Sequence, residues 1–219
     1  MTPVGSAAVV FDLDGTLIDS FVLIAESYRH AAQTVLGRSL TEDEVVARWG
    51  EPLQVRVAHL APDRGEELIA AYTAYYEAHH DRLCRLFPGI PEMLAALAAH
   101  GCRQGVVTSK RRRATAHALE RFGLGVWIQA AVCAEDVRVP KPAPDPILQV
   151  RTRLDAARSD AWMVGDAVFD IEAARGAGVR SVAALWGARE REALRAARPD
   201  YVATRPADVV SLVTSVSSG

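Results

Sequence analysis

Cysteine, lysine and long apolar runs are scarce in this chain of 219 residues. The three cysteines, Cys84, Cys102 and Cys133, lie far apart and form no CxxC pair, which argues against disulfides and against a zinc site and fits a reducing compartment. No segment reaches the ~18 apolar residues of a membrane span, and the first residues lack a basic segment followed by a long apolar stretch. We therefore expect a soluble, cytoplasmic protein.

Neither sign of charge is in excess. With 25 Lys and Arg against 27 Asp and Glu, the formal net charge is −2, so the chain offers no broad basic surface for nucleic acid. Of the 25 basic residues only Lys110 and Lys141 are lysines, which makes these two candidates for a specific point charge. Half of the residues are hydrophobic, enough for a full core.

The first motif is Asp12-Leu13-Asp14-Gly15-Thr16, which directly follows the apolar run from Ala7 to Phe11. That run predicts a strand buried on both faces, and the ligand crevice of an open parallel sheet lies at the carboxyl ends of its strands. Strand alternation would put Asp12 and Asp14 on one side, where two carboxylates favour a hard cation such as Mg²⁺. The pattern also occurs in turns and calcium loops, but the apolar residues that follow lack the oxygen ligands of an EF-hand.

A helical region without strands is expected next, from residue 18 to residue 87. Apolar residues recur at helical spacing over 19–37 and again over about 63–83, with a short helix near 54–60 between them. Thr41 to Glu44 has the pattern of a capping box before another helix. The region is about a third of the chain and ends at Phe87-Pro88-Gly89.

Strands and helices alternate after that turn. Strands are expected at 103–108, within 126–134, and at 161–165, 181–185 and 201–203, and helices at 90–100, 112–122, 144–154, 169–176, 190–197 and 206–216. Such alternation is typical of a parallel sheet covered by helices on both faces. We therefore predict a Rossmann-like, doubly wound α/β core formed by residues 1–17 and 88–219, with a small helical domain of residues 18–87 inserted after the first strand.

Polar groups also follow the second strand and occupy a later loop. Thr108, Ser109 and Lys110 precede a helix, where hydroxyls and free amides suit a phosphate, although Ser109 could equally be an ordinary helix cap. Lys141 lies between two prolines that hold its backbone rigid, which favours a fixed direction for its side chain over a plain surface lysine.

Another apolar strand, Trp162 to Val164, ends in Gly165-Asp166, with Asp170 four residues further on. Asp166 is placed to complete a metal site. Asp170 could orient that site, hold Lys141, or simply stabilise the N-terminus of the next helix.

Together, these four motifs resemble those of the haloacid dehalogenase superfamily, in order and over nearly the whole chain, and the helical insertion resembles its helical cap of the first type. The resemblance implies a phosphatase in which Asp12 is the nucleophile that forms an aspartyl-phosphate and Asp14 is the general acid and then the base. It implies Mg²⁺ held by the carboxylates of Asp12 and Asp166 and the main-chain carbonyl of Asp14. Lys141 would neutralise phosphate charge, with Thr16, Thr108, Ser109 and Lys110 binding the substrate.

The cap loop from Arg48 to Pro52 lies where this superfamily usually places its specificity loop. The resemblance therefore adds Arg48 and Glu51 to the expected substrate-binding residues, with Arg48 pairing a second anionic group of the substrate. An arginine near a helix end is otherwise a solvated residue.

Other reactions of the superfamily fit less well. Dehalogenases lack the second aspartate, and phosphonatases use a cap lysine, which residues 18–87 do not contain. The hexose-phosphate mutases carry a histidine where this chain has Ile24, and usually valine in place of Thr16. Hydrolysis is therefore favoured over phosphomutase chemistry.

The segments Trp49 to Leu53 and Val107 to Arg111 most resemble pyrophosphatases and phosphoglycolate phosphatases of the superfamily. We expect pyrophosphate or a small carboxylated phosphate ester as substrate. Nucleotide or sugar phosphates, a phosphomutase, and a non-catalytic binding protein on the same fold remain as alternatives. The sequence leaves open whether the chain is a monomer or a homodimer.

Overall fold

The computed structural model describes residues 7–46, 50–157 and 160–216. Its centre is a six-stranded parallel sheet in the order β5-β4-β1-β6-β7-β8. The strands are β1 (Ala8–Phe11), β4 (Arg103–Val107), β5 (Ile128–Val132), β6 (Ala161–Gly165), β7 (Arg180–Ala184) and β8 (Tyr201–Ala203). After β1 the chain adds β4 and β5 on one side and then returns to add β6, β7 and β8 on the other, so the strand order reverses between β1 and β6.

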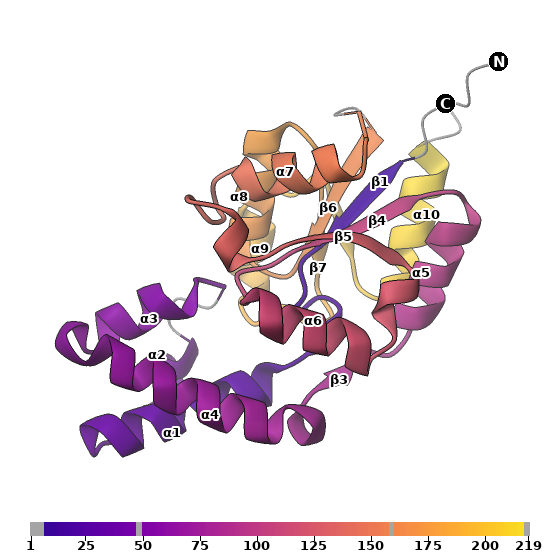
Figure 1. The fold of residues 1–219 in the computed structure, drawn as a ribbon. Helices are drawn as coiled ribbons and strands as arrows, with labels where there is room; N and C mark the ends of the chain where they lie inside the picture. Colours follow the sequence, from indigo (N-terminus) through magenta and orange to yellow (C-terminus); the bar gives the residue numbers. More distant parts are fainter. Residues whose placement is uncertain (1–6, 47–49, 158–159, 217–219) are drawn as a thin grey trace.

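Helices cover both faces of this sheet (Figure 1). All four residues of strand β1 are buried, and alternate residues face opposite sides of the sheet. Val9 and Phe11 belong to one apolar cluster, and Ala8 and Val10 belong to another, so both faces need a cover of helices. The first cluster includes residues of α5 (Ile90–Ala99), α6 (Arg112–Arg121) and α10 (Pro206–Val216), and the second includes residues of α7 (Asp145–Arg153) and α8 (Val168–Ala177). Helix α9 (Arg191–Ala196) packs by Leu194 against Ile171 of α8 and Ala183 of β7. The predicted doubly wound fold is confirmed.

The helical insertion lies beside the carboxyl edge of the sheet (Figure 1). Its helices are α1 (Phe21–Leu36), α2 (Glu42–Val46), α3 (Leu53–Leu60) and α4 (Gly65–Leu83), and short 3₁₀ turns occur at η1 (Pro62–Arg64), η2 (Leu124–Val126) and η3 (Ala134–Asp136). Helices α1 and α4 pack along each other over an apolar cluster that contains Ala25, Tyr28 and Leu68. The predicted capping box is present, since Thr41 N donates to Glu44 Oε2 (2.9 Å) and Glu44 N donates to Thr41 Oγ1 (3.2 Å).

Two short strands, β2 (Ile18–Asp19) and β3 (Arg85–Leu86), join the insertion to the sheet. They pair antiparallel where the chain leaves and re-enters the core, and Arg85 Nε lies 3.2 Å from Asp19 Oδ2. The expectation that no strand occurs between residues 18 and 87 was wrong, because two residues are too few to show strand alternation. The pair holds the two connections side by side at one edge of the insertion.

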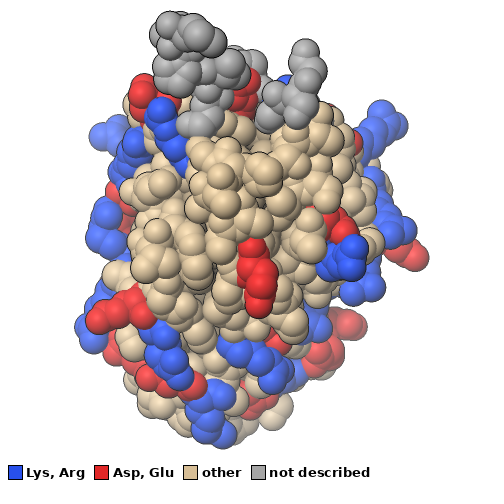
Figure 2. Space-filling view, turned by 90° about the vertical axis from the view of Figure 1, so that its right-hand side faces the viewer, with Lys and Arg blue, Asp and Glu red and all other residues tan. Residues whose placement is uncertain are grey.

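One face of the molecule carries few charges near its middle (Figure 2). This is the side of α5 and α10, whose sequences contain only Glu92 and Asp208 as charged residues. Within the part of the chain that is described, no helix is both long and apolar enough to span a bilayer. Cys84, Cys102 and Cys133 are buried free thiols.

Candidate active site

Two carboxylates from adjacent strands meet at the reversal of the sheet. Asp12 follows β1 and Asp166 follows β6, and the amide of Asp12 continues the pairing of these strands by donating to Val164 O (2.9 Å). In doubly wound sheets, the crevice for a ligand lies at this reversal, outside the carboxyl ends of the strands. Asp12, Asp166 and Asp170 each place a carboxylate oxygen within 4.8 Å of the others. The topology therefore brings together residues more than 150 positions apart in the sequence.

Lys141 reaches into this group from its proline-rich loop. Its Nζ lies 3.0 Å from Asp12 Oδ1 and 2.6 Å from Asp170 Oδ1, and it donates to Val107 O at 3.3 Å. These three acceptors match the three protons of the ammonium. Burial alone would lower the pKa of Lys141, but the two carboxylates raise it, so the side chain is charged.

Asp170 is engaged at both of its oxygens. While Oδ1 accepts from Lys141, Oδ2 accepts from the main-chain amide of Ala167 at 3.0 Å, at the start of α8. Asp170 thus holds Lys141 and also stabilises the N-terminus of α8, two roles that the sequence had left as alternatives. With both oxygens occupied, Asp170 is a support for the site and a poor candidate for a metal ligand.

The electrostatics of Asp12 and Asp166 fit a cation. Burial raises the pKa of Asp12 to about 7, against the opposing effect of Lys141, and burial followed by the charge of Asp12 raises the pKa of Asp166 well above its usual range. Asp166 Oδ1 accepts from Thr16 Oγ1 at 2.8 Å, but its buried Oδ2 has no hydrogen-bond partner among the described residues. A buried, unpartnered carboxylate oxygen near a second carboxylate suits a divalent metal ion.

Gly15 permits this close packing. Its φ is +87°, and a Cβ atom at this position would lie 2.2 Å from Asp166 Oδ2. Any other residue would therefore be strained in its backbone and would clash with the carboxylate that is a candidate metal ligand.

Asp14 is not part of the three-carboxylate group. Its Oδ1 accepts from Ser20 Oγ and from Lys110 Nζ, both at 2.6 Å, and the ammonium of Lys110 lies 5.1 Å from the centre of the Tyr76 ring. The strand geometry that would keep Asp12 and Asp14 side by side ends at Phe11, because β1 stops there. The two carboxylates nevertheless line one cavity of about 350 Å³.

The hydroxyls predicted to bind phosphate have protein partners here. Thr16 is fully buried and donates to Asp166, while Thr108 Oγ1 accepts from the amide of Lys110 at 3.1 Å. Ser109 Oγ donates to Gly50 O in the cap loop at 3.1 Å and does not cap α6, whose N-terminal cap residue is Arg111. Ser109 thus links the core to the cap, while Thr108 and Ser109 both line the cavity.

The cap supplies the other wall of the cavity. Glu51 lines it, whereas Arg48 lies outside the described residues. Sequence analysis missed Arg56, Tyr72 and Tyr76, which also line it. The two tyrosines are four residues apart on one face of α4, so the available signal was helical periodicity, which does not distinguish a core face from a binding face.

The family follows from comparison with known proteins. Residues 9–184 match the sequence model of the haloacid dehalogenase-like hydrolases. The chain belongs to this family. The predicted superfamily, the α/β fold and the class of hydrolase are therefore confirmed.

Similar proteins of this family carry phosphatase names. A protein of Caldanaerobacter subterraneus subsp. tengcongensis, provisionally named pyrophosphatase PpaX, is 40% identical over 194 residues, which cover 89% of this chain and 88% of that protein. Pyrophosphatase PpaX of Bacillus velezensis is 32% identical, over 97% of this chain and 98% of its own. A solved structure from Haemophilus somnus, described as a predicted phosphoglycolate phosphatase, superimposes with a TM-score of 0.85 at 26% identity, over 94% of this chain and 97% of its own.

Proposed function

We propose that this haloacid dehalogenase-like hydrolase is an Mg²⁺-dependent phosphatase that forms an aspartyl-phosphate on Asp12. The observation that supports this most directly is the buried group of Asp12, Asp166 and Lys141 beside a cavity of about 350 Å³ between core and cap. We propose pyrophosphate as the first substrate to test and phosphoglycolate as the second, in line with the names of the similar proteins.

The carboxylates of Asp12 and Asp166 and the main-chain carbonyl of Asp14 are the groups proposed to hold Mg²⁺. When bound, the ion supplies positive charge to the phosphate oxygens and favours the ionised form of Asp12 at neutral pH. Burial raises the pKa of this nucleophile to about 7. Lys141 contributes a second, permanent positive charge 3.0 Å from Asp12 Oδ1.

The reaction then needs two displacements at phosphorus. In the first, a carboxylate oxygen of Asp12 forms a bond to phosphorus, the bond to the leaving oxygen breaks, and Asp14 gives its proton to that oxygen. In the second, water attacks phosphorus, Asp14 takes a proton from it, and the bond between Asp12 and phosphorus breaks to release orthophosphate. Lys110 Nζ lies 2.6 Å from Asp14 Oδ1 and so fixes the position of this carboxylate beside the cavity.

The cations around the cavity support a small substrate with a second anionic group. Among the described residues, Arg56, Lys110, Arg111 and Arg113 line it, and so do the carboxylates of Asp12, Asp14, Glu51, Glu77 and Glu135. Pyrophosphate and phosphoglycolate both carry negative charge beyond the phosphoryl group that is transferred, and these cations suit it. Arg48 stays a proposed partner for the same group.

We also propose that residues 18–87 act as a cap that closes over the core of residues 1–17 and 88–219. The paired strands β2 and β3 are the proposed hinge, because both connections between the two parts run through them. Closure would exclude water from Asp12 until the substrate is bound.

The test is phosphate release from pyrophosphate, phosphoglycolate, nucleotide monophosphates and sugar phosphates, with and without Mg²⁺. We expect release from one or two of these, abolished by chelation and by Asp12→Asn. Release from none, with Mg²⁺ binding established, would contradict the proposal and favour a phosphomutase or a non-catalytic binding protein.

A further inference from the structure

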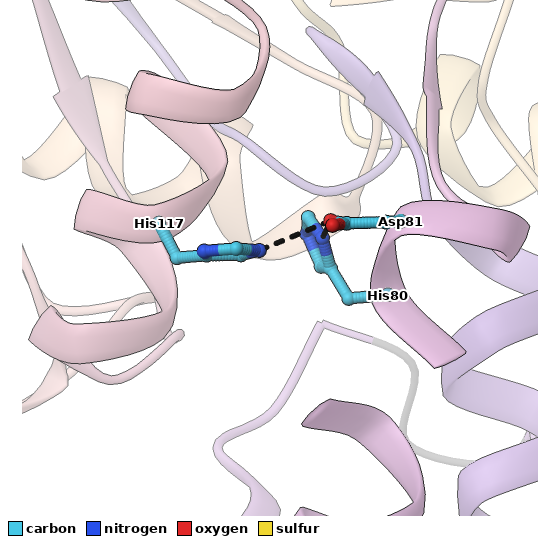
Figure 3. Close-up of side chains that lie close together, drawn as sticks. All are labelled: His80, Asp81 and His117. Carbon is cyan, nitrogen blue, oxygen red and sulfur yellow. Dashed lines mark hydrogen bonds and ion pairs between the residues drawn. The ribbon is translucent and has the colours of Figure 1, made fainter. Parts of the chain in front are cut away.

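A second group of metal-ligand side chains lies where α4 of the insertion faces α6 of the core (Figure 3). His80 and Asp81 come from the C-terminal end of α4, and His117 comes from α6. None of the three is among the residues that line the cavity between core and cap. This group, the His80–Asp81–His117 cluster, has no part in the phosphatase chemistry proposed above.

The three side chains converge on one oxygen. His80 Nδ1 lies 3.0 Å and His117 Nε2 lies 3.1 Å from Asp81 Oδ1, and the two imidazole rings meet edge to face with their centres 4.7 Å apart. Figure 3 shows both rings directed at the carboxylate from different elements. A single carboxylate oxygen thus contacts imidazole nitrogens of two histidines that are 37 positions apart in the chain (117 minus 80).

The side chain of His80 is buried and packed against aromatic rings. Its side chain is only 2% exposed, and its ring packs near those of Tyr76 and Phe122. Burial lowers its pKa against the opposing effect of Asp81, which favours the neutral imidazole that metals require. Its Nδ1 is the nitrogen that faces Asp81, while its Nε2 is buried without a hydrogen-bond partner among the described residues and lies on the other side of the ring.

The spacing of the ligand atoms fits a four-coordinate metal ion. Bonds of about 2.0–2.1 Å in a tetrahedral site put neighbouring ligand atoms about 3.3 Å apart, close to the 3.0 and 3.1 Å found here. Asp81 and His117 are 60% and 52% exposed, so water has access to the fourth position. Arg121 Nε also forms an ion pair with Asp81 Oδ1 at 3.6 Å, which a metal ion on this oxygen would have to displace.

We propose that His80, Asp81 and His117 form a binding site for a transition-metal dication such as Zn²⁺, which joins the cap to the core. Imidazole ligands favour Zn²⁺, Co²⁺ or Ni²⁺ over Mg²⁺, whereas the carboxylate oxygens of Asp12 and Asp166 favour Mg²⁺. Because the ligands come from α4 and from α6, the site is complete only when these helices are together. A bound ion therefore holds the cap in the position seen here.

The test is a titration of the chelator-treated full-length protein with Zn²⁺ by calorimetry, in an excess of Mg²⁺ that fills the carboxylate site. We expect one equivalent to bind, and Co²⁺ in its place to give the visible absorption of a four-coordinate ion. His117→Ala should bind at least about tenfold more weakly, because one of the three ligands is lost. His100→Ala, which removes an exposed histidine at the end of α5, is the matched control and should bind like the parent.

Two further variants separate this site from its alternatives. Asp12→Asn should keep full Zn²⁺ affinity, so that the proposal stands or fails independently of the phosphatase activity. Asp81→Asn changes an exposed side chain and should lose affinity as His117→Ala does. The proposal would be overturned if the parent, His117→Ala and Asp81→Asn all bound Zn²⁺ with equal affinity, or if the parent bound none in excess Mg²⁺. The cluster would then be a hydrogen-bonded contact between helices.

Discussion

Each of the two lysines of the chain forms an ion pair with one carboxylate of the first motif. Lys110 Nζ lies 2.6 Å from Asp14 Oδ1, and Lys141 Nζ lies 3.0 Å from Asp12 Oδ1. Both side chains are nearly buried, with 7% and 4% exposed, so each acts at one position and not as a general surface charge. The lysine ammonium is a compact point charge, which suits contact with a single carboxylate oxygen. At its other basic positions the chain has arginine.

Replacing Lys110 with glutamine should weaken substrate binding. Lys110→Gln removes a cation from the cavity and leaves Asp14 without its ion pair, so we expect KM for the preferred phosphate substrate to rise by about tenfold or more. Steady-state kinetics at saturating Mg²⁺ is the measurement. Arg82→Gln, at an exposed position of α4, should leave KM unchanged; an unaltered KM in both variants would remove Lys110 from the binding site.

Replacing Asp166 with asparagine should change stability and metal affinity in opposite directions. Asp166→Asn removes one of three buried carboxylates that lie close together, so in the presence of a chelator we expect the free energy of unfolding to rise by about 1 kcal/mol. The affinity for Mg²⁺ should fall by about 100-fold, because a charged ligand is lost. Thermal melts with chelator and Mg²⁺ titrations check this, with Asp63→Asn on the surface as control. A less stable variant with unchanged Mg²⁺ affinity would contradict the metal assignment.

The sequence predicted which residues meet at the edge of the sheet better than it predicted what surrounds them. Asp12, Asp166 and Lys141 could be found because each follows an apolar strand or lies in a rigid loop, and those signals are local. Arg56 and Tyr76 could not be assigned to the cavity, because helical periodicity shows that a face is buried but not what it faces. His80 and His117 could not be paired from the sequence, because they lie on different helices, 37 positions apart in the chain (117 minus 80), and meet only in the fold.

At the scale of elements, the turn η3 ties two helices to the sheet through one carboxylate. Asp136 accepts from the amide of Cys133 (2.8 Å), from Arg112 at the start of α6 (2.6 Å) and from Arg153 at the end of α7 (3.2 Å). Burial alone would raise the pKa of Asp136, but these hydrogen bonds lower it to about 2. Its side chain is 7% exposed, so little of this interaction is lost to solvent.

Asp136→Asn should therefore destabilise the protein in a pH-dependent way. The folded pKa of about 2 lies below the unfolded value near 3.8, so the stability from this group is complete above about pH 4 and is lost as the pH falls toward 2. At pH 7 we expect the variant to lose about 1–2 kcal/mol in the free energy of unfolding, and less as the pH approaches 2. Urea denaturation across this range is the measurement. Asp155→Asn, with a fully solvated side chain, should cost under about 0.5 kcal/mol, and an equal loss in both would disprove the role of Asp136.

Element boundaries were predictable where turns and caps are encoded locally. The strand at 161–165, the helix at 206–216 and the capping box of α2 agree with the structure. The ladder of β2 and β3 was missed, because its two strands come from positions 66 residues apart (85 minus 19) and are stabilised by each other rather than by their own sequence.

At the scale of the whole molecule, stability without metal should depend on pH in the direction opposite to that of Asp136. The pKa of Asp12 is raised to about 7 in the folded protein, above an unfolded value near 3.8. Between these two pH values, the contribution of Asp12 to the free energy of unfolding therefore falls as the pH rises. Without divalent ions we expect the melting temperature to fall by roughly 2–8 °C between pH 5 and pH 8, equivalent to about 1–2 kcal/mol. Mg²⁺ should restore it.

Calorimetric melts with chelator and with Mg²⁺ at both pH values check this expectation. In Asp12→Asn the dependence should be weaker than in the parent, because Asp12 can no longer ionise; the part that remains comes from Asp166, whose pKa burial also raises. A melting temperature that rises with pH in the absence of metal, or that does not respond to Mg²⁺ at pH 8, would show that Asp12 and Asp166 are not the buried acids that control stability.

The position of β1 in the sheet also determines the order in which the protein can assemble during synthesis. This strand leaves the ribosome first, but its two neighbours, β4 and β6, are translated only after the helical insertion and, for β6, after much of the core. Helices α1 and α4 share their own apolar cluster and can pair as soon as residue 83 has emerged. We therefore expect the cap to form first on the growing chain. The candidate active site comes together only when β6 places Asp166 beside Asp12.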